Sequence, residues 1–159
     1  MADARFEDGD EAALRLIAQG PEDIPVLSAL LQDAVVPAPE MRLDARARRF
    51  AILLNRFRWE DRTAAESARR PYERVRSLLV IEGVLAVRTS GIDRRDADLI
   101  LSILSLEFTP GADGAGVLTL TLAGDGAVAL EVEALDLRLE DVTRPYVAPS
   151  RHMPDHGID

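Results

Sequence analysis

The sequence contains no cysteine and no lysine. Without cysteine, the chain can form no disulfide, no thiolate nucleophile and no cysteine-ligated metal site. Without lysine, it has no Schiff-base amine and no P-loop lysine to bind a phosphate. The two histidines, His152 and His156, flank Pro154 near the end of the chain, and a proline there opposes a helical metal site. The residue types therefore indicate a protein without a bound metal or another cofactor.

Motifs for catalysis are missing too. No serine lies in a Gly-x-Ser-x-Gly turn, and no histidine precedes the last eight residues to serve as its base. The glycines form no phosphate-binding motif. Glutamates spread through the expected strands leave a carboxylate pair open as an alternative, although no pattern marks one. The sequence therefore favours a role other than that of an enzyme, and we assign no catalytic residue.

Long apolar runs are also absent. No stretch approaches the ~18 uninterrupted apolar residues of a membrane helix, and the acidic residues 1–11 lack the apolar core of a signal peptide. Apolar residues still make up 47% of the chain, which is enough for a buried core. We expect a soluble, cytoplasmic protein with no membrane contact. It should have a flexible segment at 1–11, a single α+β domain at 12–142 and an extended proline-rich tail at 143–159.

The apolar pattern predicts an α+β fold. One N-terminal helix, with apolar residues at helical spacing from Ile24 to Ala34 and an end near Val35, should pack on a mainly antiparallel, strongly twisted sheet or half-barrel of about seven strands. A polar loop should cover residues 60–71, and a turn or bulge should lie at Gly83. Strands are expected at residues 12–18, 41–43, 49–59, 72–81, 84–89, 100–108, 117–123 and 127–133.

The hairpin around Gly124-Asp125-Gly126 can be registered from its pattern. A loop of three residues pairs Ala123 with Ala127 and places the leucines and valines of both strands on one face. A two-residue loop would instead set leucines opposite glutamates. We therefore predict the three-residue loop, with Gly126 at a positive φ. After residue 134 the alternation changes phase, which predicts a bulge or strand bend.

The arginines are distributed unevenly. Residues 42–76 hold 11 of the 19 arginines and 5 acids, a charge of +6, whereas the rest of the chain carries −15. Such a split indicates either an anion-binding face or internal neutralisation of one part by another. The expected strand 49–59 spans about 30 Å and divides the arginines into two groups. The group at the far end of this strand, near the predicted loop, is the one we consider as a site.

Six residues define this candidate site: Asn55, Arg56, Arg58, Trp59, Arg74 and Arg76. One reading is a stacking and charge platform for a nucleotide or an RNA strand. The other reading, which we favour, is that the aromatic residues fill the core while the arginines pair with nearby acids.

Three functions remain open from the residues alone. The favoured one is a non-catalytic binding or protein-interaction module, whose partner is an unknown protein or a small anionic ligand. The second is anion or nucleic-acid binding through the arginine group, although the acidic remainder disfavours nucleic acid in general. The third is a small-molecule enzyme that uses carboxylates and arginines. The oligomeric state cannot be predicted.

Four segments carry a resemblance to a known family. They are RRFAILLNRFRWED, RVRSLLVIEGVLAVRTSGID, LTLAGDGAVALEVE and DVTRPYVAPS, and the likeness extends over about residues 14–150. The chain resembles an uncharacterised bacterial family, typical of alphaproteobacteria, known as domain of unknown function number 2948. The resemblance implies a soluble bacterial protein. It supplies no activity, substrate or site residue.

Overall fold

The computed structural model describes residues 13–69, 71–93 and 95–147. Predictions for residues 1–11, for the tail beyond Val147 and for the two histidines lie outside these residues. Within them, the chain forms an antiparallel sheet of eleven strands and two short helices, α2 (Ile24–Leu31) and α3 (Arg62–Ala68). The strands are β1 (Arg15–Ala18), β2 (Val35–Pro37), β3 (Met41–Asp44), β4 (Arg49–Phe57), β5 (Glu73–Glu82), β6 (Val84–Ser90), β7 (Ile100–Pro110), β8 (Gly116–Leu122), β9 (Gly126–Val132), β10 (Leu137–Asp141) and β11 (Tyr146–Val147).

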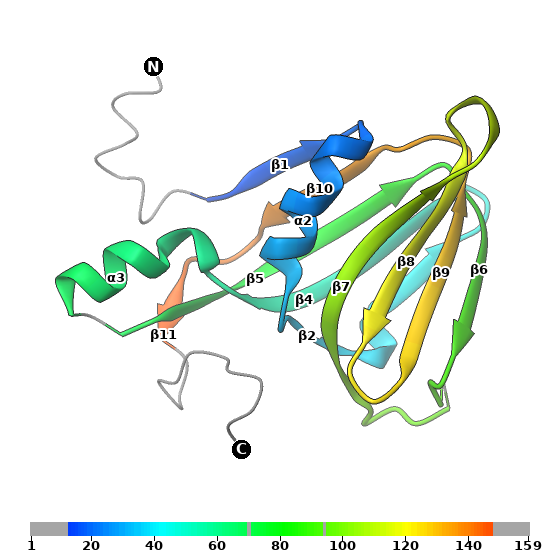
Figure 1. The fold of residues 1–159 in the computed structure, drawn as a ribbon. Coiled ribbons are helices and arrows are strands. Elements are labelled where there is room, and N and C mark those ends of the chain that lie inside the picture. The colour runs from blue at the N-terminus through cyan, green and yellow to red at the C-terminus, as the bar shows by residue number, and fades with distance from the viewer. Residues whose placement is uncertain (1–12, 70, 94, 148–159) are drawn as a thin grey trace.

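The strand order runs β1-β10-β5-β4-β2-β7-β8-β9-β6, while β3 pairs with β4 and β11 pairs with β5. Figure 1 shows two halves of this sheet, with β1, β10, β5 and β4 in one and β7, β8, β9 and β6 in the other. The expectation of one N-terminal helix on about seven strands is therefore wrong. The very short β2 and β11 show no periodicity, and the polar α3, which buries only Ala65, carries no apolar stripe.

Helix α2 packs against β7 and β4 and buries Ile24, Leu27 and Leu31, the apolar stripe that the sequence predicts. Its predicted end near Val35 is wrong, because the helix ends at Leu31. Asp33 has a φ of 67°, a left-handed conformation that aspartate tolerates better than most residues. This turn redirects the chain, so that β2 pairs with both β4 and β7.

Strand β4 is central, as its apolar character predicts. It lies between β5 and the pair β2 and β3, and Phe50, Ile52 and Leu54 point into the core. The predicted hairpin between β3 and β4 is confirmed, with Asp44 opposite Arg49. Residues with odd numbers in β4 lie on the outer face, because side chains alternate along a strand.

The chain turns twice at one corner of the sheet. Gly83, at a φ of 69°, turns the chain from β5 into β6, and residues 133–136 turn it from β9 into β10. The two turns are joined by backbone hydrogen bonds, from Glu133 N to Gly83 O (3.0 Å) and from Glu82 N to Asp136 O (2.9 Å). The predicted turn at Gly83 and the predicted phase change after residue 134 are both confirmed.

The loop between β8 and β9 has three residues, as predicted, but it is shifted by one position. Leu122 pairs with Gly126, so the loop consists of residues 123–125. The prediction of a positive φ at Gly126 is wrong, since Gly124 (83°) and Asp125 (70°) hold the left-handed conformations. The predicted faces survive, because a shift of two residues in register leaves every side chain on the same side.

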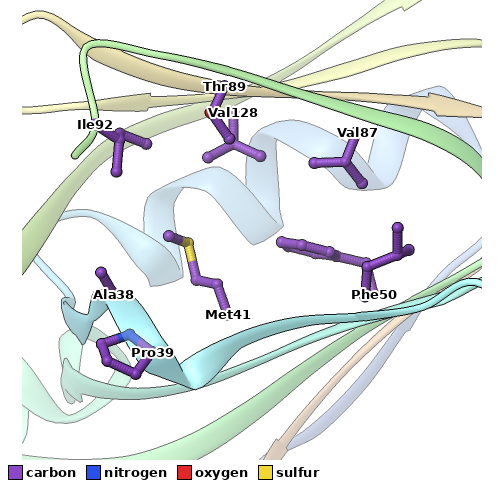
Figure 2. Close-up of a pocket in the computed structure, with 9 residues that line it drawn as sticks. Ala38, Pro39, Met41, Phe50, Val87, Thr89, Ile92 and Val128 are labelled. Carbon is purple, nitrogen blue, oxygen red and sulfur yellow. The ribbon is translucent and has the colours of Figure 1, made fainter. Parts of the chain in front are cut away.

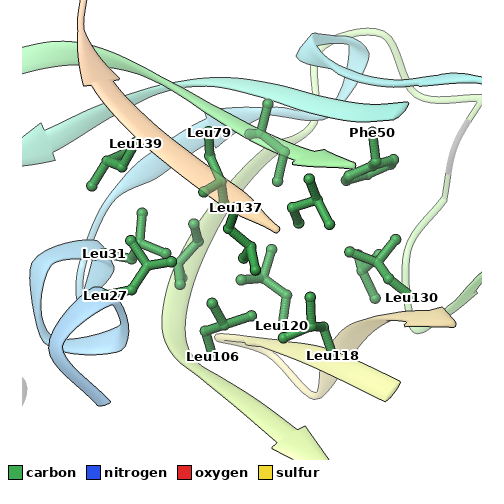
Figure 3. Packing of buried hydrophobic residues seen from close by; sticks show 14 of the residues in the cluster. Leu27, Leu31, Phe50, Leu79, Leu106, Leu118, Leu120, Leu130, Leu137 and Leu139 are labelled. Carbon is green, nitrogen blue, oxygen red and sulfur yellow. The ribbon is translucent and has the colours of Figure 1, made fainter. Parts of the chain in front are cut away.

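One apolar cluster joins the two halves of the sheet. Figure 3 shows Leu79, Leu137 and Leu139 of one half facing leucines of the other half, while Leu27 and Leu31 of α2 close one side. These leucines are almost wholly inaccessible to water, and each buried side chain of this kind contributes about 1.5–3 kcal/mol to folding. The halves therefore form one core.

Candidate functional site

The six predicted site residues lie around the end of β4 and the start of β5, beside α3 and β11 (Figure 1). Strand alternation divides them between two faces. Arg56 follows Leu54 on the inner face, whereas Asn55 lies on the outer face together with Arg74 and Arg76 of β5. The two groups therefore have different surroundings.

Arg56 lies at the polar end of the core and is fully buried. Its two terminal nitrogens donate to the two carboxylate oxygens of Glu60, at 2.8 and 2.7 Å. Nη2 also lies 3.0 Å from Asp141 Oδ1, and Nε donates to the Ser77 hydroxyl at 3.1 Å. This hydroxyl donates in turn to Asp141 at 2.8 Å. The bidentate geometry and two counter-charges leave this guanidinium no open donor direction for a ligand.

The titration of this cluster reflects the competition between burial and charge. Burial alone would lower the pKa of Arg56, but the hydrogen bonds and charges of Glu60 and Asp141 outweigh it and raise the pKa. Burial would likewise raise the pKa of Glu60, but the hydrogen bond and the charge of Arg56 more than offset it, so that this pKa lies below its ordinary value. Both groups are therefore held in their charged forms.

Arg58 is also buried and surrounded by carboxylates. Its Nη1 donates to Glu73 and lies 3.6 Å from Asp61, a residue that is itself buried. Its backbone N–H donates to the Glu73 carbonyl at 2.9 Å, which fixes the chain at the end of β4. Arg58 and Arg56 thus serve internal neutralisation.

Trp59 packs into the fold. Its ring lies edge-on to Phe57, with centroids 4.5 Å apart, and Phe57 also contacts Tyr72 at 5.6 Å. The indole N–H donates to the Gln32 carbonyl at 2.9 Å, which ties α3's end of the sheet to the end of α2. Phe57 is buried and so is closed to stacking with a base, while the half-buried Trp59 is held in the fold by its N–H and by its contact with Phe57.

The outer face presents a different arrangement. Arg74 Nε donates to Asn55 Oδ1 at 2.8 Å, and Nη2 donates to the Asp33 carbonyl at 3.0 Å. The amide of Asn55 donates to the hydroxyl of Tyr146, which lies directly opposite Arg74 in the pairing of β11 with β5. Arg76, two residues further along the same face, is exposed. Within the described part of the chain, neither Arg74 nor Arg76 forms an ion pair with a carboxylate.

Burial is the dominant influence on Arg74. It lowers the pKa of this guanidinium below its ordinary value, and the charges of Tyr146 and Asp33 oppose the shift only in part. The cation therefore lies half-buried, with neutral oxygens as its hydrogen-bond acceptors and the charge of Asp33 compensating its burial only in part, in surroundings that a further negative charge would improve. Toward the other described residues, Arg74 Nη1, the guanidinium of Arg76 and the Tyr146 O–H form no hydrogen bond as donors.

This outer group, which we call the arginine pair, consists of Arg74 and Arg76 with Asn55 and Tyr146. Sequence reasoning did not include Tyr146, because β11 is only two residues long and gives no pattern. The sequence does contain a signal that Asn55 and Arg56 lie on different faces, since they are neighbours in a strand whose even positions are apolar. No local pattern indicates Asp141 as a partner of Arg56, because the two residues are 85 positions apart.

Other chemistry finds little support in the described residues. No group of three or more histidine, cysteine, aspartate or glutamate side chains converges there to hold a metal ion. In that part of the chain, neither α2 nor α3 has the length and apolar character of a membrane-spanning helix.

Comparison with known proteins identifies a family but no individual relative. A search of curated proteins and a search of solved structures gave no significant match. A family model described as "Protein of unknown function (DUF2948)" matches residues 14–156, which is most of the chain and includes every residue of the arginine pair. The chain therefore belongs to the DUF2948 family.

Proposed function

We propose that the protein is a non-catalytic binding module that takes a small anionic group, a carboxylate or a phosphate, at the arginine pair. The observation that carries this proposal is that Arg74 and Arg76 lie side by side on one face and, among the described residues, form no salt bridge with a carboxylate, so that the charge of Asp33 opposes the effect of burial on Arg74 only in part. The other two arginines of the region, Arg56 and Arg58, already form such salt bridges.

The donor geometry supports an anion of modest size. Arg74 is held by Asn55 and by the Asp33 carbonyl, so its fork is fixed before a ligand arrives. A guanidinium that is already oriented loses less side-chain entropy on binding, and hydrogen bonds to ionised groups are about twice as strong as neutral ones. Arg76 and the Tyr146 hydroxyl would add donors from the same face.

Nucleic acid is less well supported as the ligand. The site offers two arginines that form no salt bridge with the other described residues, whereas the chain outside residues 42–76 carries a charge of −15. Affinity for a polyanion grows with the number of phosphates that are neutralised. Phe57 is buried and is not open to stacking with a base. We therefore favour a single anionic group over a nucleic acid strand.

The single tryptophan provides a direct assay. Trp59 donates to the carbonyl of Gln32 and Arg74 donates to that of Asp33, so a ligand at Arg74 lies next to this indole through adjacent residues. Titration with inorganic phosphate and with succinate should give a saturable change in tryptophan emission. Added sodium chloride should weaken it, because surface charges are screened.

Two substitutions locate the ligand. Arg76→Gln should weaken binding about tenfold or more, in line with the roughly 1.5–3 kcal/mol of a hydrogen bond to a charged group. Arg42→Gln, which removes an exposed arginine of β3 elsewhere on the sheet, should leave binding unchanged. Equal losses in both variants, or no saturable signal, would overturn the proposal. Tighter binding of a single-stranded RNA with a steep salt dependence would transfer the site to nucleic acid.

A further inference from the structure

The second feature of interest is an opening in the sheet, at the other end of β4 from the arginine pair. Among the described residues, β6 is the last strand of the sheet and pairs only with β9, while β3 pairs only with β4. The two halves meet at one end of this opening, where Val84 N donates to Arg48 O at 2.8 Å and Arg48 lies 3.6 Å from Glu133. Away from that contact, a pocket lies between them.

The pocket has a volume of about 290 Å³. Figure 2 shows Met41 and Phe50 on one side of it, and Val87, Ile92 and Val128 on the other. Phe50 and Val128, on its two opposite sides, are buried, whereas Thr89 is exposed and supplies the one side-chain hydroxyl among the described lining residues.

The lining restricts the charge of a ligand. None of the described residues that line the pocket is charged, so an ionised group beside them would lose its water without gaining a counter-charge. The described lining also holds no carboxylate pair for acid–base chemistry. Apolar side chains line the pocket together with the Thr89 hydroxyl and polar backbone groups, which suits a neutral molecule that has both an apolar and a polar part.

The volume restricts the size of the ligand. An apolar cavity of about 150 Å³ is enough to bind benzene, and this pocket is roughly twice that size. A bicyclic aromatic molecule or a short branched aliphatic one therefore fits. Met41 adds adaptability, because an unbranched thioether side chain adjusts to irregular shapes.

We propose that this pocket is a second binding site, which takes a neutral small molecule of about bicyclic size with both an apolar and a polar part. It is separate from the arginine pair, since the pocket-lining Phe50 and the site residue Asn55 lie at different ends of β4 and on opposite faces. The inference does not depend on the proposed anion function, and either can fail without the other.

The test uses 1-naphthol as the probe and the full chain labelled with ¹⁵N. Saturable shifts of backbone amide signals should be concentrated at residues 41–50, 87–92 and 128, with the tryptophan indole signal unchanged. The anionic analogue 1-naphthoate should bind at least about tenfold more weakly at this site, because its charge has no partner there. Equal binding of the two compounds would overturn the neutral ligand class.

Substitutions that fill the pocket provide the control. Val87→Phe, at a half-buried wall position, should weaken 1-naphthol binding about tenfold or more by occupying the space. Leu85→Phe adds the same ring to the same strand at an exposed position outside the pocket, and should change nothing. If Val87→Phe fails to fold, Thr89→Phe at an exposed lining position provides the same obstruction. Binding that persists in a folded filled variant would overturn the proposal.

The same samples reveal another occupant of the pocket. Sedimentation of the wild-type chain and of Val87→Phe across a range of concentrations should show the same state of association for both. A dimer lost in this variant, together with no naphthol binding, would assign the pocket to a second copy of the chain and overturn the small-molecule site.

Discussion

Arg56 and Arg74 lie on adjacent hydrogen-bonded strands, yet their electrostatic surroundings are opposite. Arg56 meets two carboxylates, whereas Arg74 meets an amide oxygen and a carbonyl. The difference arises because neighbouring positions on a strand face opposite sides of the sheet. An arginine-rich segment on a strand is therefore best considered as two sets of residues, and here only the outer set is open to a ligand.

The first prediction concerns the buried arginine. Arg56→Leu should lower the free energy of unfolding by about 3–5 kcal/mol, because it leaves Glu60 and the buried Asp141 without their counter-charge. Arg42→Leu, at an exposed position of β3, should change it by at most about 0.5 kcal/mol. Urea denaturation followed by circular dichroism measures both. Similar losses in the two variants would contradict the role of the cluster.

The second prediction concerns acid. The pKa of Glu60 is lower in the folded state than in the unfolded chain, so its contribution to stability is complete above its unfolded value of about 4.3. As the pH falls through the lower folded value, the glutamate becomes protonated and the contribution is lost. The unfolding free energy should therefore decrease from about pH 4.5 downward, as urea titrations at several pH values would show.

Glu60→Gln is the matched variant for this acid effect. It keeps the shape of the side chain but cannot titrate, so its stability should depend less on pH below 4.5 than that of the wild type. A variant curve that runs parallel to the wild-type curve would show that other carboxylates govern the acid response.

At the scale of elements, strands with clear alternation were predictable from the sequence. Phe50, Ile52 and Leu54 alternate with less apolar neighbours, and the leucines of β8 and β9 fix their buried faces. Elements that bury little were missed. Helix α3 was expected to be a loop because it has one buried residue, and β2 was not expected because the apolar spacing of α2 extends to Ala34 and placed the end of the helix near Val35. The true end of α2 depends on the turn at Asp33, whose backbone angle cannot be inferred from an apolar pattern.

Only the approximate location of the candidate site was predictable from the sequence. Spacing along β4 and β5 brings Asn55, Arg74 and Arg76 together, and the pairing of these strands confirms that they are close. The counter-charge from Asp141 and the hydroxyl of Tyr146 arrive through pairings with β5 that span more than sixty residues of sequence. Long-range pairing of this kind leaves no local signal. The apolar pocket is built in the same way from separate segments.

The third prediction distinguishes the two glycines of the β8–β9 loop. Gly124→Ala should cost about 1 kcal/mol or more, because an alanine is strained at a φ of 83° even with open space around it. At Gly126 the φ is not positive, and an added methyl group would meet neighbours at ordinary contact distances of 3.4 Å and more. Gly126→Ala should therefore cost less. Thermal unfolding of the two variants measures the order, and the reverse order would contradict the shifted loop.

At the scale of the whole molecule, the charge imbalance is partly resolved by contacts. Arg56 meets Asp141, and Arg48 meets Glu133, so the basic segment is paired with acids far away in the sequence. Other pairs, such as Arg62 with Glu66, lie within the segment itself. Acids from the −15 part thus neutralise some of the arginines of the +6 part.

The fourth prediction follows from the topology. Arg15 of β1 pairs opposite Glu140 of β10, and the central β5 contacts strands from the middle and the end of the chain. Such non-local pairings must be closed before they contribute energy, so we expect refolding in milliseconds to seconds. Stopped-flow dilution from urea, followed by Trp59 fluorescence, measures the rate. Relaxation within microseconds would contradict it.

The corner formed by the turns at Gly83 and Glu133 also limits how the two halves of the sheet can move relative to each other. The chain passes through this corner twice, from β5 to β6 and from β9 to β10, and backbone hydrogen bonds join the two turns. The half with β6 and β9 is thus joined to the half with β5 and β10 at this corner, in addition to the join through β2, which pairs with both β4 and β7. Any separation of β3 from β6 that admits a molecule between them would have to be accommodated by these two joins.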